Sequence, residues 1–166
     1  MKPKIVISKC LGFGNCRYNG EILTIPFVDE LKERAECIPV CPEMEIGLGV
    51  PRDPILIVLE DGTQRLIQPV TNRDLTDAMQ NFCHQFLDFL NEVDGFILKC
   101  RSPSCGIGDV DIFADRKGET WLNYGNGFFA NAVFEQFKGL PVENEERLED
   151  VESREKFYST LRLIKG

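Results

Sequence analysis

Three cysteines stand just after predicted buried strands, where a parallel sheet would bring their thiols together. Cys10 follows a β-branched run, Cys41 follows a short apolar run, and Cys105 lies in the loop after the run Gly95–Leu98. The carboxyl ends of parallel strands face one edge of a sheet, and ligands bind in the crevice at that edge. Thiolates are the usual ligands of iron–sulfur clusters. The placement therefore predicts that these three thiols converge on one metal centre.

The other four cysteines are less well placed for such a centre. Cys37 precedes Cys41 by a strand length of roughly 13 Å, at the opposite edge of the sheet. Cys83 falls on the apolar stripe of a long predicted helix, and Cys100 alternates with apolar residues on one strand face, so both are predicted to pack. Cys16 shares a glycine-rich loop with Cys10 and stays open as a further ligand.

Two alternatives to a cluster follow from the same residues. A structural zinc site usually takes closely spaced Cys or His pairs. This chain has no Cys-x-x-Cys pair, and its one histidine, His84, falls in the predicted long helix, so zinc is disfavoured. The other alternative is that several of the seven cysteines are simply buried side chains with no metal. Their number and the absence of an export signal favour ligation or catalysis over disulfides.

The elements that must position these residues alternate between strand and helix. This order predicts an α/β protein with a Rossmann-like, mainly parallel sheet flanked by helices. The chain is predicted to be a single domain, 1–166, in which about 143–166 form an acidic C-terminal helical extension. Asp61-Gly62 predicts a hairpin, and Pro42 a helical turn. The predicted strands are 4–8, 37–40, 55–59, 65–68, 95–98 and 110–114, and the predicted helices are 26–36, 73–93, 126–137 and 151–164.

Charge and hydropathy limit the partners. A formal net charge of −8 argues against a general nucleic-acid or anionic-membrane surface, because both require a positive field. No apolar run approaches the ~20 residues of a membrane span, and no signal peptide is recognisable, so a cytoplasmic location is expected. Basic residues nevertheless lie close to several cysteines, which permits a small anionic ligand; these are Lys9, Arg17, Lys99 and Arg101.

The cysteine segments together resemble the thiouracil desulfidase (TudS) family. The resemblance runs from residue 4 to about 140 and is carried by Ser8–Leu11, Cys16–Gly20, Pro39–Glu43, Gly47–Arg52 and Leu98–Gly106. It implies a [4Fe-4S] cluster bound by Cys10, Cys41 and Cys105, with a fourth iron that lacks a protein ligand. Members of this family remove sulfur from thiouracil or thiouridine nucleotides without net redox chemistry. Cys100 departs from the small residue expected in the last motif.

Hydrolysis of a thiocarbonyl also needs a proton acceptor and a donor. Glu43 is the first candidate for proton transfer and Glu45 the second. The alternative for Glu43 is favourable electrostatics at a helix N-terminus. Ser102 is assigned to catalysis and Ser104 to substrate binding, although serines in such turns often satisfy only backbone groups.

The predicted substrate is a small thiopyrimidine, either the base or a nucleotide such as 4-thiouridine monophosphate. Arg17 and Arg52 are candidates for a phosphate, with ordinary ion pairs as the alternative. No stable complex with a nucleic-acid polymer is expected, and a homodimer is compatible with the sequence. Two other functions stay open. One is a non-catalytic electron carrier or redox sensor in which Cys16 or Cys100 completes four ligands, and the other is a zinc-stabilised binding module.

Overall fold

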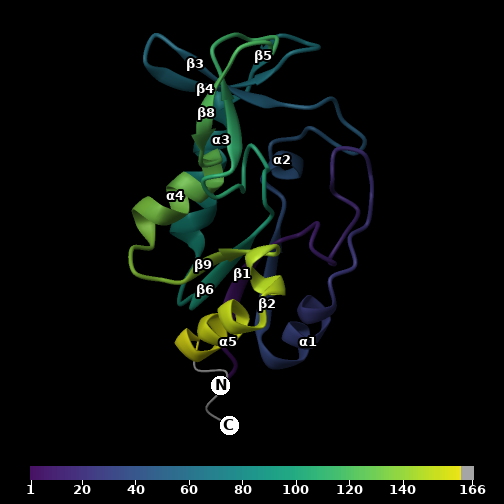
Figure 1. Ribbon diagram of the computed structural model, residues 1–166, viewed down its shortest axis with the longest axis vertical. Helices are drawn as coiled ribbons and strands as arrows, with labels where there is room; N and C mark the ends of the chain where they lie inside the picture. Colours follow the sequence, from purple (N-terminus) through teal and green to yellow (C-terminus); the bar gives the residue numbers. More distant parts are fainter. Residues whose placement is uncertain (162–166) are drawn as a thin grey trace.

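The computed structural model describes residues 1–161, in which two sheets are arranged end to end along the long axis of the molecule (Figure 1). Most predicted elements are present with boundaries shifted by a few residues. In chain order the elements are β1 (Lys4–Ser8), α1 (Pro26–Arg34), β2 (Glu36–Val40), α2 (Pro42–Glu45), β3 (Leu56–Glu60), β4 (Thr63–Gln68), β5 (Arg73–Asp74), α3 (Thr76–Phe89), β6 (Gly95–Leu98), β7 (Val110–Phe113), β8 (Trp121–Gly125), α4 (Phe128–Gln136), β9 (Val142–Asn144), the short 3-10 helix η1 (Arg147–Glu149) and α5 (Val151–Thr160).

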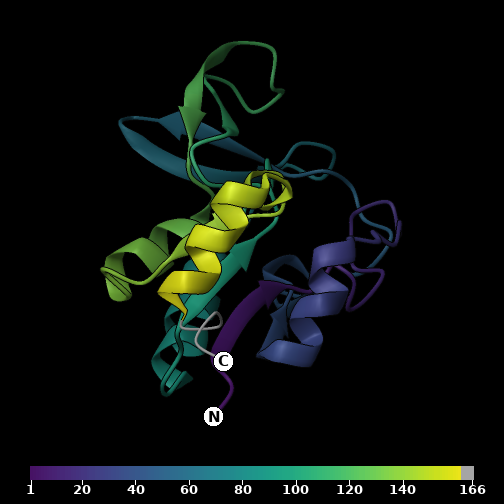
Figure 2. The ribbon, with the colours of Figure 1, turned by 60° about the horizontal axis from the view of Figure 1, so that its bottom comes forward.

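The first sheet is parallel throughout, with the strand order β2-β1-β6-β9. Side chains alternate between its two faces. Ile5, Ile7 and Ile97 point to one face and pack with residues of α1 and α5, which lie on the near side of the sheet in Figure 2. Val6 and Phe96 point to the other face and pack with α3 and α4. The predicted class, a parallel sheet flanked by helices, is confirmed.

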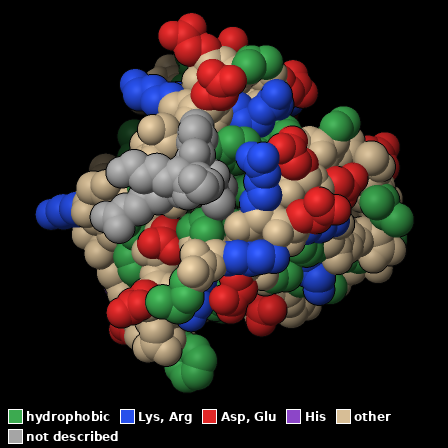
Figure 3. Space-filling model, turned by 90° about the horizontal axis from the view of Figure 1, so that it is seen from below, with side chains coloured by type: hydrophobic (Ala, Val, Ile, Leu, Met, Phe, Trp, Pro, Cys, Tyr) green, Lys and Arg blue, Asp and Glu red, His purple; other side chains and the backbone are tan. Residues whose placement is uncertain are grey.

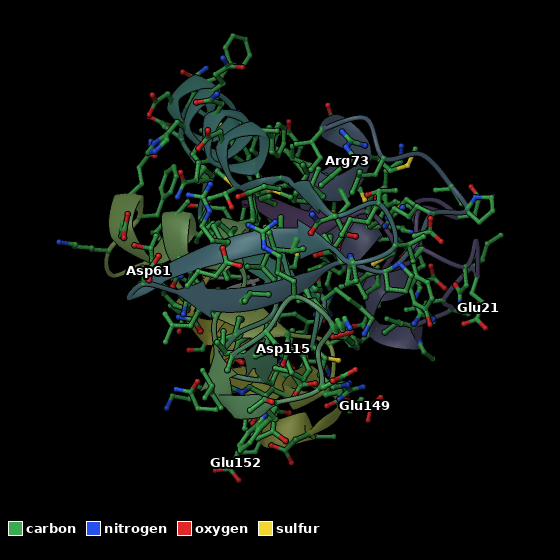
Figure 4. The ribbon with its side chains drawn as sticks, turned by 90° about the horizontal axis from the view of Figure 1, so that it is seen from above. Glu21, Asp61, Arg73, Asp115, Glu149 and Glu152 are labelled. Carbon is green, nitrogen blue, oxygen red and sulfur yellow. The ribbon has the colours of Figure 1, made fainter. Side chains whose placement is uncertain are left out.

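The second sheet has the order β5-β4-β3-β7-β8 and is antiparallel except for the β3–β7 pair. Its β3–β4 hairpin turns at Asp61 and Gly62, whose φ angles of 50° and 76° are those of a two-residue turn that favours glycine. This confirms the predicted hairpin. Figure 4 looks down on this sheet, with Asp61 at the hairpin tip and Glu21 on the opposite side of the molecule.

The predicted helix over 73–93 is shorter at both ends. Asp74 lies in β5 and its carboxylate accepts a hydrogen bond from the Thr76 backbone, so the helix begins only there. The Thr76 hydroxyl in turn accepts a hydrogen bond from the Leu66 backbone, which ties the helix start to β4. The strands β5, β8 and β9 were not predicted, because two of them have two or three residues and β8 is an exposed edge strand without an apolar alternation.

The C-terminal part of the described chain is packed against the rest of the protein. The segment predicted as an acidic helical extension begins in β9, which pairs with β6, and Leu148, Phe157 and Tyr158 are buried with α1. The predicted terminal helix extends to residue 164, and residues 162–164 lie outside the described part. Within residues 1–161 no helix is long and apolar enough to cross a membrane. On the face seen from below, acidic and basic side chains are interspersed (Figure 3).

The core between the parallel sheet and the helices α3 and α4 should contribute most to the stability of the fold. Phe96 is fully buried and its ring centroid lies 5.3 Å from that of Phe137. We expect Phe96→Ala to lower the free energy of unfolding by about 3–5 kcal/mol, because it removes the apolar contacts and leaves a cavity. Phe89→Ala is the control, since Phe89 is exposed and its loss should change the free energy by less than about 0.5 kcal/mol. Denaturant unfolding compares the two, and equal effects would contradict the packing.

Candidate active site

One cavity of about 410 Å³ lies at the carboxyl edge of the parallel sheet. Its walls are the segments that follow β1, β2 and β6, together with residues of β3 and β7 from the second sheet. The cavity therefore lies where the two sheets meet, at the edge that the strand order predicts for a ligand site. Its volume falls within the range of small-molecule sites, about 300–1,000 Å³.

The three cysteines singled out from the sequence all line this cavity. Cys10 lies just after β1. Its neighbour Lys9 still donates a backbone hydrogen bond to the carbonyl of Val40 in β2, so strand pairing extends almost to Cys10. Cys41 lies between β2 and α2, and Cys105 lies in the loop after β6. The parallel pairing of β2, β1 and β6 brings these three positions to one edge, as predicted.

Two further cysteines line the same cavity. The thiol of Cys16 lies next to the thiols of both Cys10 and Cys41, and contact with the Cys10 thiol is the first cause that raises the pKa of Cys16. Cys100 was predicted to pack on the face of its strand, but β6 ends at Leu98 and Cys100 lies in the following turn, with its sulfur 3.1 Å from Lys99 Nζ. Packing alone therefore does not describe Cys100.

Cys83 and Cys37 lie away from the cavity, as predicted. Cys83 belongs to α3 and its side chain packs in the core that α3 forms with the parallel sheet. Cys37 is partly buried against the core on the α1 side of the sheet.

Burial and contact with neighbouring groups raise the pKa of two of the proposed ligand thiols, Cys41 and Cys105, which favours their protonated form. Burial is the main cause that raises the pKa of Cys105, to about 12. The pKa of Cys41 is also raised, first by its hydrogen bond with the Cys16 thiol and then by burial. All seven cysteines are free thiols. Thiolates would need a nearby positive charge to form here, and a metal centre that binds them would release their protons.

The donor set suits a cluster better than a single ion. Among residues 1–161, no group of three or more His, Cys, Asp and Glu is close enough to hold one metal ion. A structural zinc ion needs four tightly gathered ligands, whereas a cubane cluster keeps its thiolates farther apart. Thiols from three strand ends line one cavity here, and thiolates are the usual iron–sulfur ligands.

A carboxylate with two fixed partners stands beside the thiols. Glu43, in α2, accepts a hydrogen bond from Arg52 Nε at 3.1 Å and another from the Ser104 hydroxyl at 3.1 Å. The side chains of Glu43 and Arg52 are 12% and 4% exposed. Arg52 also donates to the carbonyl of Gly49 at 2.9 Å. Arg52 therefore lines the cavity as the partner of Glu43, and its predicted phosphate contact stays a prediction.

The two serines have different surroundings. The Ser102 hydroxyl accepts backbone hydrogen bonds from Ser104 and Cys105, so it shapes the turn that carries Cys105. The Ser104 hydroxyl lies 3.0 Å from that of Ser102 and contacts Glu43. The contact with the carboxylate, expected of a catalytic serine, is thus made by Ser104.

The N-terminus of α4 holds the loop that carries Cys105. The backbone N–H groups of Phe128 and Phe129 donate to the carbonyls of Pro103 and Ser104, and that of Gly127 donates to Gly106. These bonds satisfy N–H groups that a helix start leaves without partners. A Cβ placed on Gly127 would lie 2.5 Å from the carbonyl carbon and oxygen of Ser104. Gly127 therefore permits a close approach that no larger residue allows.

Gly127→Ala should displace this loop. The added methyl meets backbone atoms, so we expect a loss of about 1–3 kcal/mol in the free energy of unfolding, together with a lower iron content after anaerobic reconstitution. At Gly125 the nearest atoms are side-chain atoms of Ile112 at 3.2 Å, so Gly125→Ala should cost less and leave iron content unchanged. Equal behaviour of the two variants in denaturation and iron assays would rule out the close contact as the cause.

The basic side chains of the cavity wall are mostly paired with acids. Arg17, which is half-buried, pairs with the exposed Glu21 at 2.7 Å, and Arg101 pairs with Glu146 at 2.7 Å on the surface. Lys99 lies 3.3 Å from the buried Glu145.

Glu145 was not predicted as a site residue. Leu98 of β6 is in register with Asn144 of β9, so the next residues, Lys99 and Glu145, are neighbours across the two strands. One oxygen of Glu145 accepts the Cys100 backbone N–H at 2.6 Å, and the other lies near the Lys99 ammonium without hydrogen-bond geometry. Because β9 gives no sequence signal, no pattern in the chain indicates this contact.

Comparison with known proteins agrees with this geometry. The chain is similar to a solved structure described as a [4Fe-4S]-dependent thiouracil desulfidase, TudS, with a TM-score of 0.72 and 25% identity over 98% of this chain and 100% of that one. It is also 30% identical over 114 residues to the uncharacterized protein YbbK of Bacillus subtilis (strain 168), covering 64% of this chain and 75% of YbbK. The model of the 2-thiouracil desulfurase family matches residues 5–145, a range that contains every cavity residue discussed above, and the chain belongs to that family.

Proposed function

We propose that this protein hydrolyses a thiolated pyrimidine to its oxo form and releases hydrosulfide. The observation that carries the proposal is the juxtaposition, on one cavity wall, of Cys10, Cys41 and Cys105 with the hydrogen-bonded pair Glu43–Ser104. The reaction exchanges the ring sulfur for the oxygen of water, so it needs no external oxidant or reductant. Membership of the 2-thiouracil desulfurase family supports the same chemistry.

Cys10, Cys41 and Cys105 are the proposed ligands of a [4Fe-4S] cluster, the cofactor in the description of the similar TudS structure. When bound through three cysteines, such a cluster supplies an iron with an open position, a Lewis acid with affinity for sulfur. The thiols come from three separate strand ends, so the folded sheet is what holds them around the cavity.

Glu43 is the proposed proton acceptor for the attacking water. Its carboxylate lines the cavity, while Arg52 holds one carboxylate oxygen and Ser104 the other. The ion pair with Arg52 fixes the orientation of Glu43, which general base catalysis requires. The hydroxyls of Ser104 and Ser102 lie 3.0 Å apart and form a path along which a proton from Glu43 can move.

The cavity wall also offers contacts to an anionic substituent on the substrate. It carries five basic side chains, Lys9, Arg17, Arg52, Lys99 and Arg101, and two acidic ones, Glu43 and Asp111. Arg52 is paired with Glu43, and Arg17, Lys99 and Arg101 are paired with acids outside the wall. Arg17, at 24% side-chain exposure, is accessible, so the phosphate of a thiouridine monophosphate can bind it in competition with Glu21.

Sulfide release tests the proposal. Anaerobically reconstituted protein should release sulfide from 2-thiouracil, 4-thiouracil or 4-thiouridine monophosphate. The thiocarbonyl absorbance of the substrate should fall in proportion to the sulfide released. Iron-loaded protein that turns over none of these substrates, yet accepts and returns an electron reversibly, would instead be a non-catalytic cluster protein. Zinc in place of iron and labile sulfide would exclude both functions.

A further inference from the structure

Cys16 is a cavity thiol that the proposed mechanism does not use. Cys16 is 3% exposed, it lines the cavity together with Cys10 and Cys41, and its thiol lies next to the thiols of both. The Cys41 thiol also contacts the backbone carbonyl of Cys16 at 3.8 Å. Cys16 thus lies next to two of the three proposed ligands at once.

The backbone around Cys16 is free of sheet pairing. Between β1 and α1 the chain forms turns, such as the hydrogen bond from Gly20 to the carbonyl of Arg17, and no helix or strand. A small displacement of Cys16 therefore breaks no strand ladder. Cys10 and Cys41, in contrast, are held at the ends of two paired strands.

The third proposed ligand has different neighbours. The thiol of Cys105 contacts the hydroxyls of Ser8 and Ser104, and within residues 1–161 no other thiol makes a hydrogen bond with it. A serine hydroxyl is a poor substitute for a thiolate on iron, because iron–sulfur clusters favour the softer sulfur ligand.

We propose that Cys16 is an alternative cluster ligand, able to replace Cys10 or Cys41 but not Cys105. The proposal rests on the proposed cluster and its three ligands. The exchange forms one iron–sulfur bond to Cys16 in place of the bond that the removed cysteine would have made. The Cys16 thiol gives its proton to solvent, and no electron is transferred.

Serine variants test this exchange through metal content. The set is Cys10→Ser, Cys41→Ser, Cys105→Ser and Cys16→Ser, with the double variants Cys10→Ser/Cys16→Ser and Cys41→Ser/Cys16→Ser. Cys83→Ser is the matched control, because Cys83 is a buried thiol far from the cavity wall. Each protein is reconstituted anaerobically, and iron and acid-labile sulfide are measured per chain beside a circular dichroism spectrum that confirms folding.

Each outcome supports or overturns the proposal. We expect Cys16→Ser, Cys10→Ser and Cys41→Ser to keep most of the wild-type iron, and both double variants and Cys105→Ser to lose it. If Cys10→Ser and Cys41→Ser hold as little iron as the double variants, Cys16 does not replace either ligand and the proposal is refuted. If Cys16→Ser alone loses its iron, Cys16 is a primary ligand and not an alternative one. If Cys105→Ser stays loaded, the proposed ligand set itself is wrong. Should a serine variant not fold, the alanine variant carries the same comparison.

Discussion

Glu43→Gln should lower the turnover of the thiopyrimidine by about 10²–10⁴-fold, the usual contribution of a general acid–base residue. Glutamine keeps the shape of the side chain, its carbonyl oxygen can still accept from Arg52 and its amide group can donate to the Ser104 hydroxyl, but it takes up no proton from water at neutral pH. The partners of Glu43 come from two other segments, so the cavity should keep its form. Iron content should therefore stay near the wild-type value, while the loss of the charge that pairs with the buried Arg52 should lower stability.

The measurement is sulfide release under saturating substrate, with iron and labile sulfide determined on the same samples. Glu45→Gln is the control, because Glu45 belongs to the same helix, α2, but is exposed. It should leave turnover unchanged. A loss in Glu45→Gln with full activity in Glu43→Gln would transfer the proton acceptor to Glu45, the second carboxylate that the sequence suggests.

Cys105→Ser should abolish both cluster binding and sulfide release. Cys105 is 3% exposed and lies in the turn held by Ser102 and by the N-terminus of α4. Those contacts involve its backbone and its neighbours, so serine should leave the turn in place while removing the soft donor. Loss of iron with an unchanged unfolding transition would show that the side chain acts as a ligand.

Cys83→Ser separates ligation from burial in this prediction. Cys83 is 2% exposed, and burial raises the pKa of its thiol to about 12, as it does for Cys105. Placing a hydroxyl in that apolar position should cost about 1–3 kcal/mol of stability, yet the protein should still take up iron and release sulfide. Full turnover by Cys105→Ser would refute the proposed site.

The positions of the cavity thiols follow from signals that are local in the sequence. Ile5, Val6 and Ile7 form a β-branched run that gives a buried strand in almost any context, and Gly95–Leu98 is similarly apolar. Once these strands are taken as parallel, the residues after each of them must share an edge. No contact between distant side chains was needed for that prediction.

The side-chain contacts within the cavity could not be predicted from the sequence, because they depend on the direction in which each side chain points. Whether Ser102 or Ser104 meets Glu43 depends on the turn that the Ser102 hydroxyl stabilises. The role of Arg52 depends on a loop that returns its guanidinium to α2. Glu145 joins the site through the three-residue strand β9, which is too short to show a period.

The strand order also sets a sequence of events during protein synthesis. Cys10 and Cys41 flank the neighbouring strands β1 and β2 and leave the ribosome early, whereas Cys105 follows β6, and the helix that steadies its loop, α4, is made later still. Until Cys105 is made, the nascent chain holds Cys10, Cys16 and Cys41 but lacks the one proposed ligand that Cys16 does not replace. We therefore expect stable iron binding only after Cys105 has been translated, and a chain truncated before Cys105 should be recovered without metal.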